Sequence, residues 1–559
     1  MNKASKRPSR RTFLNAMTAG LGAALVAPAE FVLGEQNTFE LSQEHRRAVD
    51  RRRRIVVQYD PQDLYGIDFQ TWIDYRFRYI DEPGTQIDSV FWDMGRLGRV
   101  LYPSKFLDPL VHPGLRKWRD QSIDLVGWLV TETRRRGLEV FWNHRVSEVD
   151  MDSEGTGAAW RDGPDPLKRA HPEWVLKTNW WRHGLWNFAV PAVRVHTVRA
   201  LREVAEKYDF DGLQIDFARH VPCLPPGRQW ELRHHVTELM RMARRMTLEV
   251  ARGRKRPLLL AAKVPENLEG CRIDGFDVGS WCRENLVDIL TLGSRSADVN
   301  LAAFRRIAAP RNIKFQPCFD DHHTTDGYRY APIEVLRGVF ADWWQQGADS
   351  VVTFNWSNAP PEVCKRLGQL PGPISHQEAY HEIGSLATMA FKDKTFVVQR
   401  RGGYPWAEGF FNRNDTALLP MRLRGEASAA IPVRLSDDLP QHAARVRSVM
   451  LRAILFNATD DQPVQTELNG TLLPLLTRDP RWKDAQIFSP KPQPASGGSG
   501  VYPVDPRQRF LRLDFGVDPR KCRAGENLVR LSVGRAKEAA AEEVVLEKLE
   551  IHVCYAARQ

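Results

Sequence analysis

Short apolar runs alternate with amphipathic stretches over the first two thirds of the chain. Eight runs of five to seven residues, rich in β-branched and aromatic side chains, lie at 55–59, 89–93, 138–144, 212–216, 258–263, 287–292, 313–317 and 350–356. Between them, residues 118–136, 192–207 and 231–250 carry apolar side chains at the spacing of a helix. Strands that alternate with helices form βαβ units, and eight strands over about 330 residues predict a (β/α)₈ barrel, the TIM-barrel fold.

The pattern changes near residue 390, where short alternating strands replace the βαβ repeat. These strands are expected at 396–398, 431–435, 448–456, 464–468, 509–515 and 527–533. Asn469-Gly470 follows one of them and is typical of a tight hairpin turn. We therefore expect the catalytic barrel over residues 51–388, after a linker at 30–50, and a C-terminal β-sandwich domain over residues 389–559.

The N-terminus has the three features of an export signal. Residues 9–14, Ser-Arg-Arg-Thr-Phe-Leu, resemble the twin-arginine motif, residues 16–26 are apolar and rich in Gly and Ala, and residues 27–29 form an Ala-Pro-Ala cleavage pattern. This predicts a signal peptide over residues 1–29 and a mature protein exported to the periplasm or outside the cell. No apolar run reaches the ~18 residues of a membrane helix, so we expect no stable membrane anchor.

Charge and cysteine content narrow the function classes. The formal net charge is +11, but five basic and no acidic residues lie within 1–29, and the run Arg51–Arg54 is expected to be the solvated flank of a strand. Without a basic stripe interleaved with aromatic residues, no nucleic-acid partner is expected. Seven scattered cysteines without a C-x-x-C pair predict buried thiols and no zinc site, and no cofactor is expected.

Polar side chains gather where the predicted barrel strands end, which is where TIM barrels place their active sites. The strand ends and the loops after them carry Asp93, Asn143, His144, Arg145, Asp216, Arg219, His220, Lys263, Glu266, Ser294, Asp320, Asp321, His322, Asn355 and Trp356. This density of carboxylates and hydrogen-bonding groups indicates a catalytic site at the C-terminal face of the barrel.

The carboxylates favour cleavage of a glycosidic bond in a poly- or oligosaccharide. That reaction needs one carboxyl group to protonate the leaving oxygen and another to attack the sugar or activate water. Asp216 closes a rigid apolar strand and is predicted to be the ionised carboxylate of this pair. The alternative is a structural role, in which Asp216 only forms an ion pair with Arg219. The proton donor is expected to be Glu266, then Asp320, then Asp321.

The other strand-end residues are expected to bind substrate. They are Asp93, Asn143, His144, Arg219, His220, Lys263, Asp321, His322, Asn355 and Trp356. The long segment 145–190 also holds five tryptophans, which are suited to stacking on sugar faces.

Four sequence segments resemble the family-10-like group of bacterial glycosyl hydrolases. They are His-Pro-Glu-Trp at 171–174, Trp-Asn-Phe at 186–188, Pro-Ala-Val-Arg at 191–194 and Tyr-Asp-Phe-Asp-Gly-Leu-Gln-Ile-Asp-Phe-Ala-Arg at 208–219. The resemblance implies a TIM barrel that acts on carbohydrate. A looser similarity to the α-amylase clan also marks Asp216. Gln214 stands where that clan has Arg and Glu266 follows a Pro rather than a Gly, so that clan's mechanism does not carry over.

Two other functions fit parts of the pattern. Asp320-Asp321-His322-His323 and His144 supply possible metal ligands for a metal-dependent hydrolase, although the first strand lacks the H-x-H pair that such barrels usually have. A non-catalytic, carbohydrate-binding barrel is the second alternative, because a fold does not by itself determine an activity.

Overall fold

The computed structural model describes thirteen segments of the chain. They are residues 38–61, 63–146, 166–177, 183–219, 221–294, 296–320, 327–356, 359–369, 374–400, 417–423, 428–487, 504–534 and 543–557. Within these segments, no helix is both long and apolar enough to cross a bilayer.

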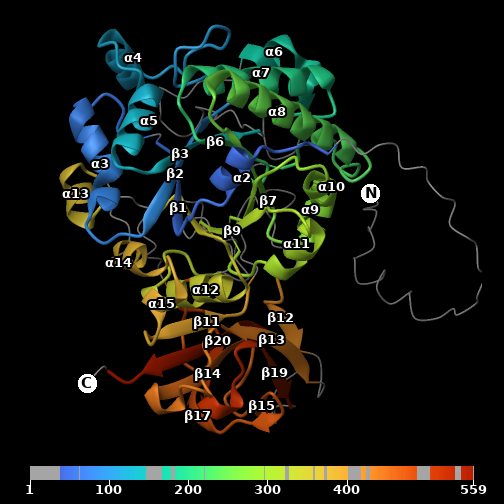
Figure 1. The fold of residues 1–559 in the computed structure, drawn as a ribbon. Coiled ribbons are helices and arrows are strands. Elements are labelled where there is room, and N and C mark those ends of the chain that lie inside the picture. Colours follow the sequence, from blue (N-terminus) through green and yellow to red (C-terminus); the bar gives the residue numbers. More distant parts are fainter. Residues whose placement is uncertain are drawn as a thin grey trace, which may run out of the picture. The chain divides into compact units, whose positions relative to one another are not determined.

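Eight parallel strands close into a barrel, as predicted (Figure 1). They are β1 (Ile55–Tyr59), β2 (Ile87–Gly95), β3 (Glu139–Arg145), β6 (Gly212–Asp216), β7 (Leu259–Val264), β8 (Ile289–Leu292), β9 (Lys314–Phe319) and β10 (Val351–Phe354). Each strand pairs with the next one in this order, and β1 closes the ring against β10. The prediction of a (β/α)₈ barrel is confirmed.

Helices surround the strands and pack on them through a large apolar core. The long ones are α3 (Phe69–Asp81), α5 (Leu125–Arg135), α7 (Pro191–Lys207), α8 (Arg233–Arg254) and α12 (Ile333–Gln345). Shorter ones are α4 (Pro113–Asp120), α6 (Pro166–Ala170), α9 (Leu268–Asp274), α10 (Val278–Arg283), α11 (Leu301–Ala308), α13 (Pro361–Arg366), α14 (Ile374–Glu382) and α15 (Leu386–Met389). A short hairpin of β4 (Val175–Leu176) and β5 (Leu185–Trp186) lies in the segment between β3 and α7.

One predicted helix is wrong: residues 118–136 form the end of α4 and the whole of α5. Ser122 has a positive φ of 59°, which an α-helix does not allow. Asp124 then starts a new helix, because its Oδ1 accepts a hydrogen bond from the Gly127 N–H. The apolar spacing continued across the break and hid it.

Residues 30–50, predicted to be a linker, contribute the helix α2 (Gln43–Val49) to the barrel. Val49 packs with the side chains that fill the barrel interior. His45 contacts the Asp288 carboxylate at 2.9 Å, and Arg244 of α8 contacts the same carboxylate at 2.9 Å. This buried network fixes α2 to the N-terminal end of the barrel.

The C-terminal region is a β-sandwich, as predicted. One sheet has the order β11 (Lys394–Val397), β20 (Val544–Tyr555), β14 (Val446–Phe456), β18 (Phe510–Val517) and β17 (Leu475–Asp479), with β12 (Met421–Leu423) also paired to β20. The other has the order β13 (Ala429–Leu435), β19 (Gly525–Val533), β15 (Val464–Leu468) and β16 (Thr471–Leu472). Apolar side chains of both sheets form one core. Asn469 and Gly470 both have positive φ in the β15–β16 turn, as expected for Asn-Gly.

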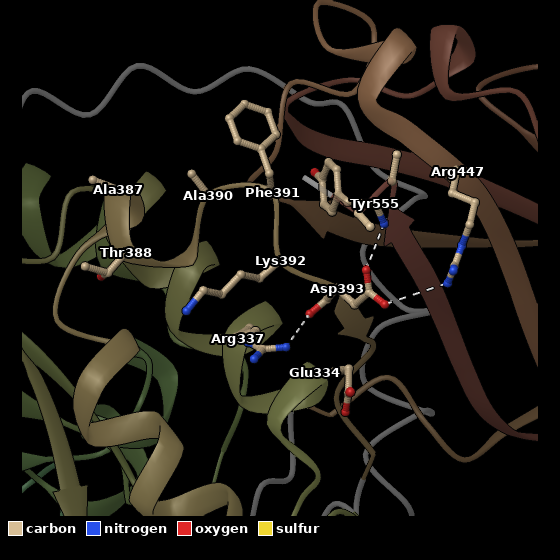
Figure 2. Close-up of a pocket in the computed structure, with 12 residues that line it drawn as sticks. Glu334, Arg337, Ala387, Thr388, Ala390, Phe391, Lys392, Asp393, Arg447 and Tyr555 are labelled. Atoms are coloured by element: carbon tan, nitrogen blue, oxygen red, sulfur yellow. Dashed lines mark hydrogen bonds and ion pairs between the residues drawn. The ribbon is translucent and has the colours of Figure 1, made fainter. Parts of the chain in front are cut away.

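The segment before β11 connects barrel helices to the sandwich. A hollow of about 750 Å³ opens there, and Figure 2 shows three contacts that converge on Asp393 at its edge. Arg337 of α12 donates to the Asp393 carbonyl at 3.3 Å, the Tyr555 N–H donates to its Oδ1 at 2.8 Å, and Arg447 lies 4.0 Å from Oδ2. Arg337 also pairs with Glu382 at 2.6 Å, so the cations of this region already have anionic partners.

Candidate active site

The barrel interior changes from apolar to polar along its axis. A cluster that includes Val56, Phe91, Phe141, Ile289 and Val352 fills the interior. Side chains alternate between the two faces of a strand, so the residues two positions further along these strands also point inward. On that basis the inward positions nearest the C-terminal ends carry Gln58, Asp93, Asn143, Arg145, Gln214, Asp216, Lys263, Thr291, Gln316, Cys318, Asp320 and Phe354.

Asp216 lies at the end of β6 and is fully buried. Its Oδ1 accepts a hydrogen bond from the Ala218 N–H at 3.0 Å, which fixes the carboxylate against its own loop. Its Oδ2 accepts from Gln58 Nε2 at 3.4 Å and lies 4.0 Å from Lys263 Nζ. Hydrogen-bond donors and a cation therefore surround the carboxylate.

Lys263 supplies the buried positive charge of this group. Its side chain has no exposed surface, and its Nζ donates to Gln58 Oε1 at 3.2 Å. The same atom lies 3.7 Å from the centroid of the Phe354 ring, a cation–π contact. Asp216 and Lys263 therefore lie close together, and Gln58 connects the two residues.

A layer of neutral polar side chains supports Gln58. Gln214 Nε2 donates to Gln58 Oε1 at 3.3 Å and to Asn143 Oδ1 at 2.7 Å. Gln214 Oε1 accepts from Thr291 Oγ1 at 2.5 Å, and Thr291 Oγ1 accepts from Gln316 Nε2 at 2.7 Å. These side chains come from five different strands, so the layer holds the barrel together beneath the strand ends.

A second carboxylate group lies on the β1–β2–β3 side. Arg145 Nη2 contacts Asp60 Oδ2 at 2.9 Å and Asp93 Oδ2 at 2.5 Å. Burial raises the pKa of Asp93 to about 6; the Arg145 charge opposes this rise, while the negative charges of Asp60 and Asp216 add to it. Asp93 thus holds a proton into the mildly acidic range.

Buried atoms of Asp93 and its neighbour Asn143 have no hydrogen-bond partner among the residues that the structure describes. They include Asp93 Oδ1 and Asn143 Nδ2, and both side chains are buried. Asp93 and Asn143 are paired positions of β2 and β3, so their Cα atoms lie side by side. An acceptor and a donor are thus available for a bound ligand.

Two of the three predicted proton donors, Asp320 and Glu266, lie in described segments and have different surroundings. Asp320 lies near the Asp216–Lys263 group, because all three residues act on the thiol of Cys318. Burial raises the pKa of that thiol to about 12; the charge of Lys263 opposes the rise, and the charges of Asp320 and Asp216 add to it. Glu266 is buried after β7 beside Gly293, where a Cβ would lie 3.0 Å from Glu266 Cβ. The Arg219 guanidinium lies 5.6 Å from the Phe354 ring centroid, and its charge acts on Asp93.

Two predicted substrate ligands point away from the barrel interior. His144 and Trp142 lie on the same outward face of β3, and Trp142 Nε1 lies 3.5 Å from His144 Nδ1. Burial lowers the pKa of His144 to about 3, and the charge of His196 adds to this effect. Asn355 has a φ of 58°, which ends the alternation of β10. Trp356 therefore turns outward, stacks on His376 at 4.3 Å and donates to the Phe319 carbonyl at 3.0 Å.

Other predicted residues lie outside the described segments. They are His220, Asp321 and His322, together with Trp160, Trp180 and Trp181. Of the remaining tryptophans in 145–190, Trp186 is buried and Trp174 stacks on His171 at 4.1 Å. In the described segments, no group of three or more His, Cys, Asp or Glu side chains has a geometry that holds a metal ion. The seven cysteines are free thiols, six of them buried, as predicted.

Sequence reasoning from strand ends missed Gln58, Thr291 and Gln316. Each lies one to three residues before the end of its strand, inside an otherwise apolar run. A polar residue at an inward position of an apolar strand was the available signal, because burying it is unfavourable unless it is hydrogen-bonded.

Comparison with known families agrees with the sequence resemblance. Residues 76–224 match the model of a family described as Glycosyl hydrolase-like 10. The matched segment contains β2, β3 and β6, and therefore Asp93, Asn143, Arg145 and Asp216. The resemblance seen in residues 171–219 is confirmed. No curated protein gives a significant match to the chain.

Solved structures that resemble the chain include three glycoside hydrolases. The α-L-fucosidase isoenzyme 2 from Paenibacillus thiaminolyticus is 17% identical over 59% of this chain and 48% of its own, with a TM-score of 0.38; the match thus spans about half of that protein. The PgaB (BpsB) glycoside hydrolase domain from Bordetella bronchiseptica is 13% identical over 60% and 99%, also with a TM-score of 0.38. A GH27 β-L-arabinopyranosidase from Geobacillus stearothermophilus is 9% identical over 89% and 100%, with a TM-score of 0.35.

The raised pKa of Asp93 predicts a pH-dependent effect on stability. The folded state holds this proton up to about pH 6, whereas the unfolded chain releases it near 3.8, so folding is penalised increasingly as the pH rises through 6. The full penalty is about 3 kcal/mol. Asp93→Asn removes it, so the free energy of unfolding of the variant relative to the natural protein is expected to rise between pH 4 and pH 7.5. Urea unfolding at both pH values measures this. A difference that is constant with pH contradicts the prediction.

Proposed function

We propose that this protein is a glycosidase that hydrolyses a poly- or oligosaccharide at the C-terminal face of its barrel. The observation that carries the proposal is the pair of buried carboxyl groups, Asp216 and Asp93, within the segment that matches a glycosyl hydrolase-like family. Two carboxyl groups with different proton affinities are what acetal hydrolysis requires.

Asp216 is proposed as the ionised carboxylate, acting as nucleophile or as the base that activates water. Its support is the ring of donors around it, Ala218 N–H, Gln58 Nε2 and Lys263 Nζ. It ends a strand whose neighbours on both sides are also barrel strands, so a rigid element presents it.

The proton donor is proposed among three buried carboxyl groups. Glu266 and Asp320 follow from the sequence pattern, and the structure adds Asp93, whose pKa of about 6 suits a general acid near neutral pH. Asp93 also lies in the family-matched segment, whereas Glu266 and Asp320 lie beyond it. Asp93 is therefore our first choice.

Substrate hydroxyl groups are proposed to contact Asn143, Arg219, Lys263 and Asn355. Asn143 has a buried donor that is unused in the described segments, and Asn355 is half-buried at the strand end. His220, Asp321 and His322 follow the same strand ends and stay in the proposed set. His144 and Trp356 are proposed as packing residues, because they face away from the barrel interior.

Replacing Asp216 tests the proposed activity. Asp216→Asn is expected to lower kcat by about 10²–10⁴-fold on any polysaccharide or aryl glycoside that the protein hydrolyses. Asp211→Asn is the matched control, because Asp211 precedes the same strand and bonds the Val140 N–H and Arg256 at its other end. Release of reducing sugar, measured with chelator present, reports the rate.

Three outcomes of that assay exclude the proposal. Equal losses in Asp211→Asn and Asp216→Asn would show a structural effect only. Activity that disappears with chelator and returns with metal would indicate the metal-dependent hydrolase. Saturable binding of glycans without turnover would indicate the non-catalytic carbohydrate-binding barrel.

A second prediction identifies the proton donor. A good leaving group departs without protonation, so Asp93→Asn is expected to lower kcat/KM strongly on polysaccharide and poor leaving groups but by less than about tenfold on a dinitrophenyl glycoside. Glu266→Gln and Asp320→Asn serve as parallel variants. The role belongs to Glu266 or Asp320 if one of these variants, and not Asp93→Asn, separates the two substrate types.

We also propose that the protein is exported by the twin-arginine route. The support is the order of basic pair, apolar stretch and Ala-Pro-Ala at 27–29. N-terminal sequencing of the mature protein is expected to begin at Glu30. Replacing Arg10 and Arg11 together with Lys is expected to retain the full-length precursor inside the cell, and continued export of that variant would contradict the route.

A further inference from the structure

The polar layer beneath the active site contains a continuous chain of hydrogen bonds. It begins at Ser350 Oγ, which donates to Gln316 Oε1 at 3.0 Å. It continues through Gln316 Nε2 to Thr291 Oγ1, and through Thr291 Oγ1 to Gln214 Oε1. It then passes from Gln214 Nε2 to Gln58 Oε1, and from Gln58 Nε2 to Asp216 Oδ2. Every link donates toward Asp216.

Lys263 fixes the direction of this chain. A lysine ammonium has only donors, so the Gln58 atom that it contacts at 3.2 Å must be the carbonyl oxygen. The Gln58 amide nitrogen then faces Asp216. The same oxygen of Gln58 also faces Gln214, which must therefore present its nitrogen there.

The constraint passes along the remaining links. With its nitrogen directed at Gln58, Gln214 turns its oxygen to Thr291, so the threonine hydroxyl must donate its only proton. The Thr291 oxygen then accepts from Gln316 Nε2, and the remaining oxygen of Gln316 accepts from Ser350. One cation thus sets the orientation of five neutral side chains.

We infer that Gln58, Gln214, Thr291 and Gln316 are positioning residues that act through this directed chain to hold Asp216 as an anion. Asp216 is then the nucleophile or base of the proposed hydrolysis and never its proton donor. The assignment rests on the proposed function for its catalytic meaning. The orientation of the chain and its effect on the Asp216 carboxylate do not depend on any substrate.

Physical reasons connect the chain to the charge of Asp216. Hydrogen bonds in a row polarise one another, so the final N–H carries more positive charge than an isolated amide. The chain residues are buried, where the low dielectric strengthens such interactions. A donor aimed at a carboxylate favours its ionised form and opposes protonation.

The test interrupts the chain two links before Asp216. Thr291→Val removes the hydroxyl and preserves the shape of the side chain. The matched control is Thr353→Val, a buried barrel threonine whose hydroxyl contacts Tyr380 OH at 3.3 Å outside the chain. Thr291→Ser keeps a hydroxyl and is the rescue variant, and Ser350→Ala removes only the first donor.

The measurement is a carbon-13 NMR titration of the full chain labelled at aspartate carboxyl carbons, with the Asp216 signal assigned by its loss in Asp216→Asn. The pKa of Asp216 is expected to rise by about 0.5–1 in Thr291→Val, by less in Ser350→Ala, and to stay at its natural value in Thr291→Ser and Thr353→Val. Where hydrolysis is measurable, the acidic limb of kcat/KM should move up by the same amount.

The outcomes separate this inference from the proposed function. A shift in Thr291→Val without any hydrolysis by the natural protein would support the chain and count against the glycosidase. An unchanged pKa in Thr291→Val, or an equal shift in Thr353→Val, would overturn the inference even in an active enzyme. If Thr291→Val does not fold, the same comparison is made between Ser350→Ala and Thr353→Val, and equal pKa values in those two would overturn it.

Discussion

The buried ammonium of Lys263 is the interaction on which the polar interior of this barrel depends. A protonated amine with no exposed surface must be compensated by nearby charge and dipoles. Here an anion, an amide oxygen and an aromatic face do this, from Asp216, Gln58 and Phe354. The lysine in turn orients the Gln58 amide, and through it the hydrogen-bonded layer below.

Two aspartates with the same chemistry lie in different surroundings. Asp216 receives donors and a cation. Asp93 is buried, with two other negative charges acting on it, Arg145 in close contact and the charge of Arg219 opposing the rise of its pKa. Environments that push apart the proton affinities of two carboxyl groups allow one to stay ionised while the other carries a proton. Both lie near the ends of barrel strands that the closed sheet holds in place, so these different surroundings belong to the scaffold.

Much of the fold followed from the sequence, and the misses have physical causes. The eight barrel strands were found because apolar runs of that length between helical patterns leave few other arrangements. The break between α4 and α5 was missed because Ser122 turns the chain without interrupting the apolar spacing. The central strand β20 was missed because Glu547, Lys548 and Glu550 occupy buried positions within it. They are tolerated there because distant Arg400, Asp484 and Tyr328 pair with them.

The site was predictable in position but only partly in detail. The strand-end rule gathered Asp93, Asn143, Asp216 and Lys263, because strand alternation and barrel closure turn all of them inward. It also gathered His144 and Trp356, which the same alternation and the positive φ of Asn355 turn outward. Alternation counted from an apolar inward position assigns His144 to the outward face. It would place Trp356 inward, two residues after Phe354, and only the backbone conformation of Asn355 shows otherwise. It also singles out Gln58, Gln214 and Gln316, because a polar side chain below the strand ends is stable only within a complete hydrogen-bond network. Such residues mark the support of a site as clearly as the strand-end carboxylates mark its chemistry.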